Sequence, residues 1–287
     1  MIGLNLQVRP ATLQDHQSIS NLIFTQNHAH RHLDWRPPLD WLGSPYFWLL
    51  EDDGRVLAAL ACPPDPPGIA WVRLFAFNGQ ISALEAWSVL WEVARAEIAI
   101  RDSVQTAVIA MQSWMQDLLV RMDFEWSQNI VMLEWRGRPV LQPSLPSNVA
   151  LRVMTESDLA TVEQIDADAF DPLWHISLDN LQRAFSQSVV ASVVESNGCL
   201  LGYQLSTGKT TGAHLARLAV RKDAQGAGLG KALVLDLISQ IRRRGADLIS
   251  VNTQNDNHVS LALYQKMGFL RTGEEYPVFC CHVEQGG

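Results

Sequence analysis

The sequence has little of several features that define whole classes of protein. Its four cysteines are too few and too scattered for a disulfide framework or a zinc ribbon. No apolar run approaches the ~18–20 residues of a membrane-spanning helix, and residues 1–6 do not resemble a secretory signal. Positive charge is scarce, with 22 Lys and Arg against 30 Asp and Glu, which argues against general affinity for nucleic acid. We therefore expect a cytoplasmic protein that binds neither membranes nor nucleic acid.

The composition that remains is that of a folded protein. Hydrophobic residues make up 47% of the 287 residues and charged residues 18%, so a packed core is expected and disorder is not. The length is typical of about two domains.

The two halves of the chain resemble each other at a nearly constant offset of 143 to 145 residues. Four pairs of landmarks show the offset: segments 8–15 and 151–158, the turn glycines Gly54 and Gly198, segments 71–74 and 215–218, and segments 121–124 and 266–269. Four such matches predict a tandem of one fold.

The seam between the halves contains Pro139, Pro143 and Pro146, which favour a semi-extended linker. We therefore expect a first domain over 1–136, a linker over 137–149 and a second domain over 150–287. Each half reads as an α+β fold with a mixed, mostly antiparallel sheet flanked by helices. In the second half we expect a strand at 248–251 and helices at 158–170, 227–244 and 259–267. Thr155 and Asp158 would cap the first of these helices, and Gly245 would end the second.

A glycine-rich segment, Gln225-Gly226-Ala227-Gly228-Leu229-Gly230-Lys231, follows an expected strand and opens an expected helix. Glycines at a helix N-terminus let backbone N–H groups approach an anion, and the helix dipole adds partial positive charge. The spacing fits neither a dinucleotide fingerprint nor a Walker loop. The segment therefore predicts a phosphate or pyrophosphate site, with an ordinary turn before a helix as the alternative.

A second segment, from Asn257 to Phe269, carries Leu263, Tyr264 and Gly268 at a recognisable spacing. Together with Gln225, Gly228 and Gly230, it resembles the GNAT superfamily of acyl-CoA N-acetyltransferases. The resemblance covers residues 150–287 and implies acetyl-CoA as cosubstrate. It implies that strand 218–220 leaves its neighbour and binds the pantetheine arm, while the glycine loop holds the pyrophosphate. The cosubstrate-binding residues it implies are Leu218, Ala219, Val220, Gln225, Gly226, Ala227, Gly228, Leu229, Gly230, Lys231, Asn257 and Tyr264. Arg221, Lys222 and Lys231 are candidates for further phosphate contacts, and ordinary solvated cations are the alternative.

Two residues are candidates for proton transfer. Tyr264 occupies the position of the general acid in many GNAT enzymes, although a helix tyrosine can also serve packing alone. The base is less defined, because Asn252 stands where some relatives have a glutamate. His214, with a pKa near ~6.5, is suited to the task, and strand alternation predicts that His214, Ala216 and Leu218 share one face. A histidine without a catalytic role, or a water chain to bulk solvent, are the alternatives.

Two loops carry further polar or aromatic residues. Residues 170–175 would form the acceptor pocket, where Phe170, Trp174 and Asp171 could hold a cationic amine or simply pack. Residues 27–32 contain three histidines, but no fourth ligand stands at a recognisable spacing. We therefore expect a solvated loop there and no metal.

The first half departs from the motifs. Bulky Leu84 would obstruct phosphate access, Gln112 replaces Asn257, and Leu119 replaces Tyr264. Nine of the ten tryptophans lie in this half, and Trp87 and Trp91 are expected in the core or at an interface, with a wall of the acceptor pocket as the alternative. The first half is therefore expected to be a degenerate copy that does not bind acetyl-CoA.

These observations predict an acetyltransferase that moves an acetyl group from acetyl-CoA to the primary amine of a small molecule by direct attack in a ternary complex. A protein or peptide acceptor, or a non-catalytic acyl-CoA-binding regulator, are the alternatives. The chain is expected to be a monomer or a homodimer.

Overall fold

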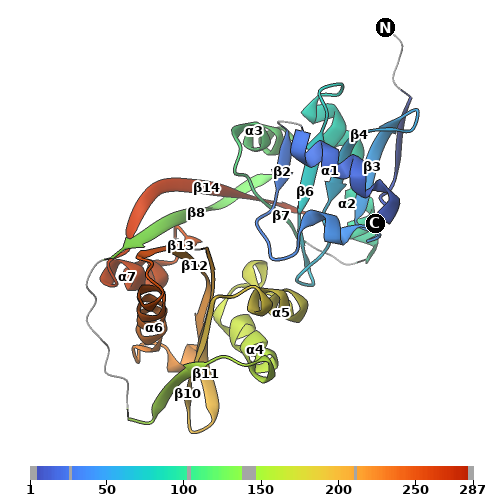
Figure 1. The fold of residues 1–287 in the computed structure, drawn as a ribbon. Helices are drawn as coiled ribbons and strands as arrows, with labels where there is room; N and C mark the ends of the chain where they lie inside the picture. Colours follow the sequence, from blue (N-terminus) through green and yellow to red (C-terminus); the bar gives the residue numbers. More distant parts are fainter. Residues whose placement is uncertain (1–4, 26–27, 102–104, 138–146, 210–211, 284–287) are drawn as a thin grey trace. The chain divides into compact units, whose positions relative to one another are not determined.

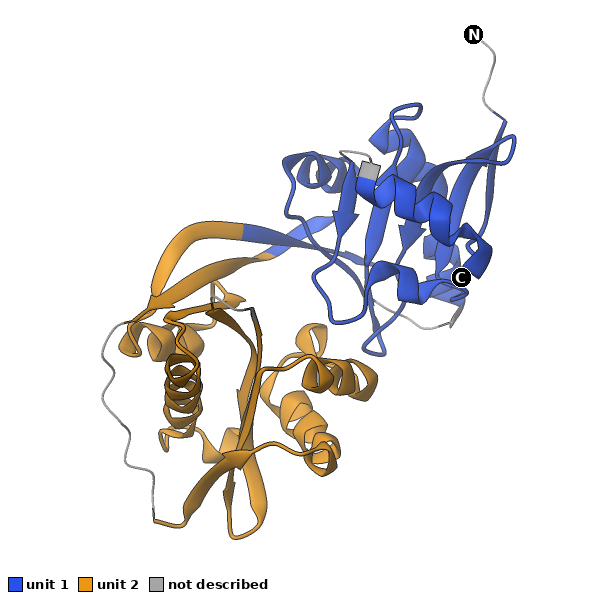
Figure 2. Cartoon of the chain, in the orientation of Figure 1, with its two compact units in different colours: residues 1–127, 276–287 blue, residues 128–275 orange. Residues whose placement is uncertain are grey.

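The computed structural model describes residues 5–25, 28–101, 105–137, 147–209 and 212–283. The chain forms two compact units (Figure 2). Unit 1 comprises residues 1–127 and 276–287, and unit 2 comprises residues 128–275.

Unit 2 contains one twisted sheet in the order β9-β10-β11-β12-β13-β8-β14 (Figure 1). Strands β9 to β12 pair antiparallel, whereas β12 and β13 are parallel. The strands are β9 (Val149–Val153), β10 (Val190–Ser196), β11 (Cys199–Lys209), β12 (Gly212–Val220), β13 (Leu248–Gln254), and parts of β8 (Glu125–Arg136) and β14 (Leu270–His282).

Helices cover both faces of this sheet. Adjacent residues of β11 point to opposite faces: Tyr203 bonds Asp166 of α4, and Gln204 bonds Ser192, which bonds Asp236 of α6. The helices are α4 (Leu159–Ala169), α5 (Leu178–Ser186), α6 (Leu229–Arg243) and α7 (His258–Lys266), with the short turns η3 (Glu156–Asp158), η4 (Pro172–Trp174) and η5 (Lys222–Ala224). None of the helices in the described ranges is long and apolar enough to span a membrane.

Unit 1 has the same kinds of element. Its strands form the order β1-β3-β4-β6-β2 and, separately, β5-β7-β14. The strands are β1 (Leu6–Pro10), β2 (Ala29–Arg31), β3 (Phe47–Asp52), β4 (Arg55–Ala61), β5 (Ile69–Trp71), β6 (Leu74–Phe77) and β7 (Gln105–Ile109), and the helices are α1 (His16–Thr25), α2 (Ala83–Arg101) and α3 (Ser113–Arg121), with the turns η1 (Leu13–Asp15) and η2 (Pro38–Trp41). Trp87 and Trp91 lie in its core, with ring centroids 5.8 Å apart, as one of the two sequence readings expects.

The internal repeat is confirmed by matching ion-pair networks. Arg9 binds Asp15 and Glu51 in unit 1, and Arg152 binds Asp158 and Glu195 in unit 2. The Nη1–Oδ2 distances are both 2.8 Å, and the Nε–Oε2 distances are both 2.9 Å. The same residue types at offsets of 143 and 144 therefore make the same contacts twice.

Local signals in the sequence also correspond to the structure. The two hairpins turn through Asp53-Gly54 and Asn197-Gly198, each with positive φ at both positions, as hairpin turns of this type require. Thr155 and Asp158 form the expected reciprocal cap, and Gly245 follows α6 with φ of +81°.

The two compact units differ from the expected linear division into 1–136, 137–149 and 150–287. Strands β8 and β14, which are neighbours, each begin in one unit and end in the other (Figure 2). Residues 278–282 of β14 pair with β7 of unit 1, and residues 130–136 of β8 pair with β13 of unit 2. The two halves thus exchange their last strands. Of the expected linker, residues 138–146 lie outside the described residues.

This exchange predicts that a substitution near the C-terminus destabilises the tryptophan-rich unit. Phe279 is 6% exposed in the core of unit 1, so Phe279→Ala should cost about 3–5 kcal/mol of unfolding free energy there. Denaturation followed by tryptophan fluorescence measures the change, with Arg271→Ala, on an exposed part of the same strand, as the control. An unchanged fluorescence transition in Phe279→Ala would contradict the exchange.

Candidate active site

The strand β12 has an unpaired edge. Its parallel ladder with β13 joins Ala213–Leu215 to Ile249–Val251, whereas its other edge pairs with β11 as far as Val220. No strand in the described part of the chain pairs with residues 216–220 on the β13 side. Backbone N–H and C=O groups of these residues that point to the β13 side therefore have no partner from a strand, and except for Val220 O, which accepts from Gln225 Nε2, they are open to water or a ligand. This edge includes Leu218, Ala219 and Val220, the residues expected to bind pantetheine.

The glycine loop leads from this edge into helix α6. Gly226 and Gly228 have φ of +80° and +82°, and a Cβ at either would meet nothing within 4 Å. Gly228 is the N-cap, and the N–H of Ala232 donates to its carbonyl, so the earlier N–H groups of the first turn are free for another acceptor. The Gln225 Nε2 donates to Val220 O at 3.0 Å, which braces the loop against the strand. The loop can therefore hold an anion on backbone N–H groups.

Gly230 lies where the loop approaches the last helix. A Cβ at this position would lie 3.3 Å from Leu263 Cδ2 of α7 and 3.8 Å from Val220 Cγ2 of β12. The loop, the end of β12 and α7 therefore meet closely, and α7 carries Tyr264 next to Leu263.

Tyr264 is 4% exposed, and its ring lies 5.6 Å from that of Phe269. Burial raises the pKa of its phenol above the ordinary value, because the charged form is poorly solvated there. The hydroxyl makes no hydrogen bond within the described residues, so it remains available as a donor.

Asn257 has a structural task. Its Oδ1 accepts the N–H of Ser260 at 3.0 Å and caps α7, and its Nδ2 donates to Gln254 Oε1 at 3.4 Å. A contact with acetyl-CoA remains a prediction from the resemblance.

Two of the cationic residues beside the loop, Arg221 and Lys222, form hydrogen bonds with carboxylates. Arg221 forms a two-bond ion pair with Asp223, at 2.6 and 2.7 Å. The backbone N–H of Lys222 donates to Asp168 Oδ2 at 2.9 Å. The Arg221 guanidinium is thus shared with a carboxylate, and phosphate contacts by Arg221, Lys222 and Lys231 remain predictions.

The expected placement of His214 on one face with Leu218 is wrong. A bulge at Ala216 interrupts the alternation, because Leu215 pairs with Ser206 and Arg217 with Leu205. Leu218 packs on the core cluster that contains Ala213 and Leu215, the neighbours of His214. His214 therefore lies on the opposite face, which is the face of Arg217 and α4.

The imidazole of His214 is largely buried. Its Nδ1 lies 2.9 Å from Ser250 Oγ on the paired strand. Burial lowers the pKa of His214 below its ordinary value, and a hydrogen bond with Asn252 opposes part of this shift. The ring is therefore neutral near pH 7.

The loop expected at the acceptor side, residues 170–175, is attached to a buried ion pair that the sequence reading did not identify. Asp166 of α4 and Arg217 of β12 lie 2.7 Å apart, with side chains 1% and 14% exposed. Phe170 and Trp174 are half-buried, and Asp171 is exposed. The sequence feature that could have indicated this ion pair is Arg217, a charged residue inside the mostly apolar strand β12.

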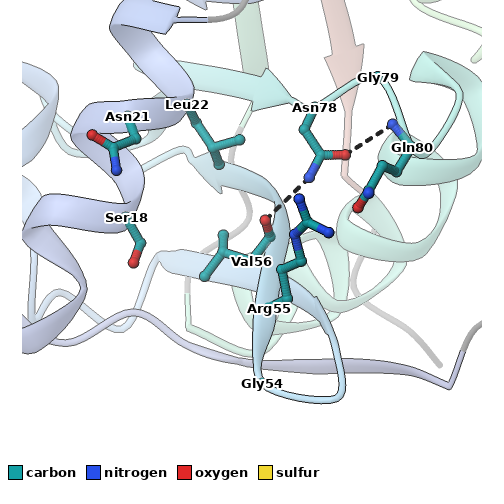
Figure 3. Close-up of a pocket in the computed structure, with 9 residues that line it drawn as sticks. All are labelled: Ser18, Asn21, Leu22, Gly54, Arg55, Val56, Asn78, Gly79 and Gln80. Atoms are coloured by element: carbon teal, nitrogen blue, oxygen red, sulfur yellow. Dashed lines mark hydrogen bonds between the residues drawn. The ribbon is translucent and has the colours of Figure 1, made fainter.

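Each unit also has a surface cavity at one equivalent place. The unit 1 cavity has about 600 Å³ and the unit 2 cavity about 350 Å³. Figure 3 shows the first, where Asn78 bonds Val56 and Gln80. Six lining residues correspond through the repeat: Ser18 with Thr161, Asn21 with Gln164, Leu22 with Ile165, Val56 with Leu200, Asn78 with Lys222, and Gly79 with Asp223. A cavity present in both copies is a property of the fold, so it does not distinguish a site in unit 2.

In unit 1 the equivalent strand edge is closed by the chain itself. Leu74–Ala76 of β6, the counterparts of residues 218–220, pair with Ala29–Arg31 of β2. The expectation of a solvated loop over residues 27–32 is therefore wrong for its described part, because Ala29–Arg31 form a strand whose His30 is 0% exposed. In the described residues no group of three or more His, Cys, Asp or Glu side chains is placed to hold a metal ion.

The counterpart of the glycine loop has a side-chain cap. The Ser82 hydroxyl accepts the N–H of Glu85 at 3.2 Å, whereas Gly228 at the start of α6 has no side chain to cap the corresponding N–H groups. Leu84 is 41% exposed beside the Ser82 cap, and Leu119, in the place of Tyr264, is part of the apolar core. In its described residues unit 1 thus has the fold without an unpaired strand edge equivalent to that of β12, without a glycine loop before α2, and without a hydroxyl at the position of Tyr264.

Comparison with known proteins agrees with this division. Residues 159–269 match the model of the acetyltransferase (GNAT) family. The chain is 29% identical over 149 residues to a mycothiol acetyltransferase of Saccharomonospora viridis, covering 45% of this chain and 48% of the relative. It is 26% identical over 134 residues to a glucosamine 6-phosphate N-acetyltransferase of Trypanosoma brucei brucei, covering 42% and 89%. The chain thus spans about half the length of the mycothiol acetyltransferase it matches.

The particular fold is that of a tandem GNAT protein. A solved tandem GNAT protein from the clavulanic acid biosynthesis pathway superposes with a TM-score of 0.65, over 99% of this chain and 100% of that chain, at 15% identity. At this identity the likeness shows the fold alone.

Two glycines that flank α6 provide a matched test of the loop. Gly228 and Gly245 have φ of +82° and +81°, and neither has an atom within 4 Å of a built Cβ. Alanine at either should cost about 1–2 kcal/mol of stability through backbone strain. Only Gly228→Ala should also weaken acetyl-CoA binding, by about tenfold or more, measured by calorimetry. Equal binding by the two variants would contradict a pyrophosphate site at this loop.

Proposed function

We propose that unit 2 transfers an acetyl group from acetyl-CoA to the primary amine of a small molecule, by direct attack in a ternary complex. One observation carries the proposal. The open edge of β12 continues into an open glycine loop, whereas the chain itself closes both features in unit 1.

The relatives support a small-molecule acceptor. Their names describe acetyl transfer, in one case to the nitrogen of a sugar phosphate. Acetyl-CoA would supply the activated thioester. The residues that fit it are those of the open β12 edge, whose N–H groups could polarise the thioester carbonyl, and of the loop from Gln225 to Lys231.

The amine must lose a proton before attack, since a group of pKa ~10.4 is neutral in only about one molecule in a thousand at pH 7. His214 is our candidate base. Its lowered pKa leaves it neutral near pH 7, and it lies on the face of β12 that carries Arg217 and the acceptor-side loop. The departing thiolate needs a proton in return, and the raised pKa of Tyr264 keeps its phenol protonated at pH 7–9.

The proposal also includes a cytoplasmic location and a chain that is a monomer or a homodimer.

A thiol-release screen with acetyl-CoA against amines, aminoglycosides, polyamines and peptides tests the proposal. We expect turnover with a small amine, and Tyr264→Phe should lower kcat by about 10²-fold or more while acetyl-CoA binding is retained. Tyr46→Phe, in unit 1, is the control and should leave turnover unchanged. Full activity of Tyr264→Phe at every pH would remove Tyr264 from the mechanism. Acetyl-CoA binding without release on any amine would contradict the proposed transfer.

A further inference from the structure

The ion pair between Arg217 and Asp166 is bidentate and buried. Arg217 Nε and Nη2 lie 2.7 Å from Asp166 Oδ2 and Oδ1, and the Tyr203 hydroxyl donates to Oδ2 at 2.5 Å. Such a pair adds little stability over well-packed apolar side chains, because desolvation offsets the attraction between the charges. We therefore infer the role of this ion pair from its contacts with the surrounding chain and not from a contribution to stability.

Most of these contacts reach one loop, residues 170–176. Arg217 Nη2 donates to the carbonyl of Trp174, and its guanidinium carbon lies 3.8 Å from the centroid of the Phe170 ring. The N–H of Ile176 donates to Asp166 Oδ1 at 3.1 Å. The loop is closed internally by His175 Nε2, which lies 3.0 Å from Phe170 O. One buried pair therefore attaches the beginning, middle and end of this loop.

Unit 1 has an equivalent arginine with a different carboxylate. Arg73 corresponds to Arg217, and its Nη1 lies 2.5 Å from Asp34 Oδ2, which is in the loop after β2 rather than in a helix. The helix position equivalent to Asp166 is Ile23, a buried apolar residue.

The position of the carboxylate differs between the two units, and so does the position of the loop next to it. In unit 1 the segment before Asp34 pairs with β6 and closes its edge. In unit 2 the corresponding residues 171–175 are held by α4 and Arg217, and the edge of β12 stays open.

We propose that the Arg217–Asp166 pair is a positioning device that anchors loop 170–176 beside the open edge of β12 and so shapes the acceptor side of the site. The proposal rests on the proposed function. The half-buried Phe170 and Trp174 would then face a cationic amine from a fixed frame, with the exposed Asp171 beside them. Neither Arg217 nor Asp166 is assigned a contact with the reacting atoms.

A double substitution separates loop attachment from folding. Asp166→Leu with Arg217→Met replaces both charges by apolar side chains, which leaves no uncompensated buried charge and should preserve the fold. The Trp174 carbonyl, the Ile176 N–H and the Tyr203 hydroxyl lose their partners. We expect amide hydrogen exchange in residues 170–176 to rise by about tenfold or more, with acetyl-CoA affinity unchanged. The KM for the amine should rise about tenfold while kcat changes less.

The control is the other ion-pair network of unit 2, in which the Arg152 side chain is 38% exposed. Asp158→Leu with Arg152→Met removes an ion pair of 2.8 Å that joins β9 to η3 and does not touch loop 170–176. Loop exchange and amine KM should stay at their wild-type values. Phe170→Leu removes only the ring over Arg217 and should change both quantities in the same direction, to a smaller extent, which keeps the test valid if the double variant does not fold.

Unchanged loop exchange, or an unchanged amine KM, in a folded double variant overturns the proposal, as would unchanged values in Phe170→Leu if the double variant does not fold. A wild-type chain that releases no thiol with any amine overturns the proposed function instead. The exchange measurement does not depend on acetyl transfer, so the two failures are distinguishable.

Discussion

The structure depends on what happens to one strand edge in each unit. Backbone N–H and C=O groups need partners, and no strand of the described chain pairs with the outer residues of β12 on the β13 side. The corresponding edge of β6 is paired with β2. Two copies with the same hairpin turns and the same Arg9 and Arg152 ion-pair networks thus differ at the place where an extended ligand arm would hydrogen-bond. The glycine loop follows the open edge and contacts α7, the helix that carries Tyr264, whereas Ser82 and Leu119 stand at the corresponding positions of unit 1.

The exchange of β8 and β14 means that the two units do not coincide with the two halves of the sequence. The tryptophan-rich core of unit 1 includes Phe279 and Val283 from the end of the chain, and the sheet of unit 2 includes β8 from the end of the first repeat. Each unit therefore needs a strand encoded in the other half. This explains in physical terms why a degenerate copy is kept as part of the folded chain: without it, β13 would lose its antiparallel neighbour.

Much of the fold was predictable because it follows from local patterns. The turn glycines, the Thr155–Asp158 cap, the glycine loop and the offset of the repeat are all short-range signals, and the structure contains each of them. The face of His214 was not predictable, because a bulge at Ala216 leaves no mark in the alternation of residue types. The strand at 29–31, the strand exchange and the Arg217–Asp166 pair depend on contacts between residues distant in sequence. The site residues themselves rest on the resemblance and on their placement around the open edge.

The central claim is that only one of the two copies can hold acetyl-CoA. The number of acetyl-CoA molecules bound per chain at saturation, measured by isothermal titration calorimetry on the intact protein, tests it most directly. We expect one per chain, because β2 and Ser82 close the equivalent features of unit 1. Two molecules per chain, or none, would contradict the account.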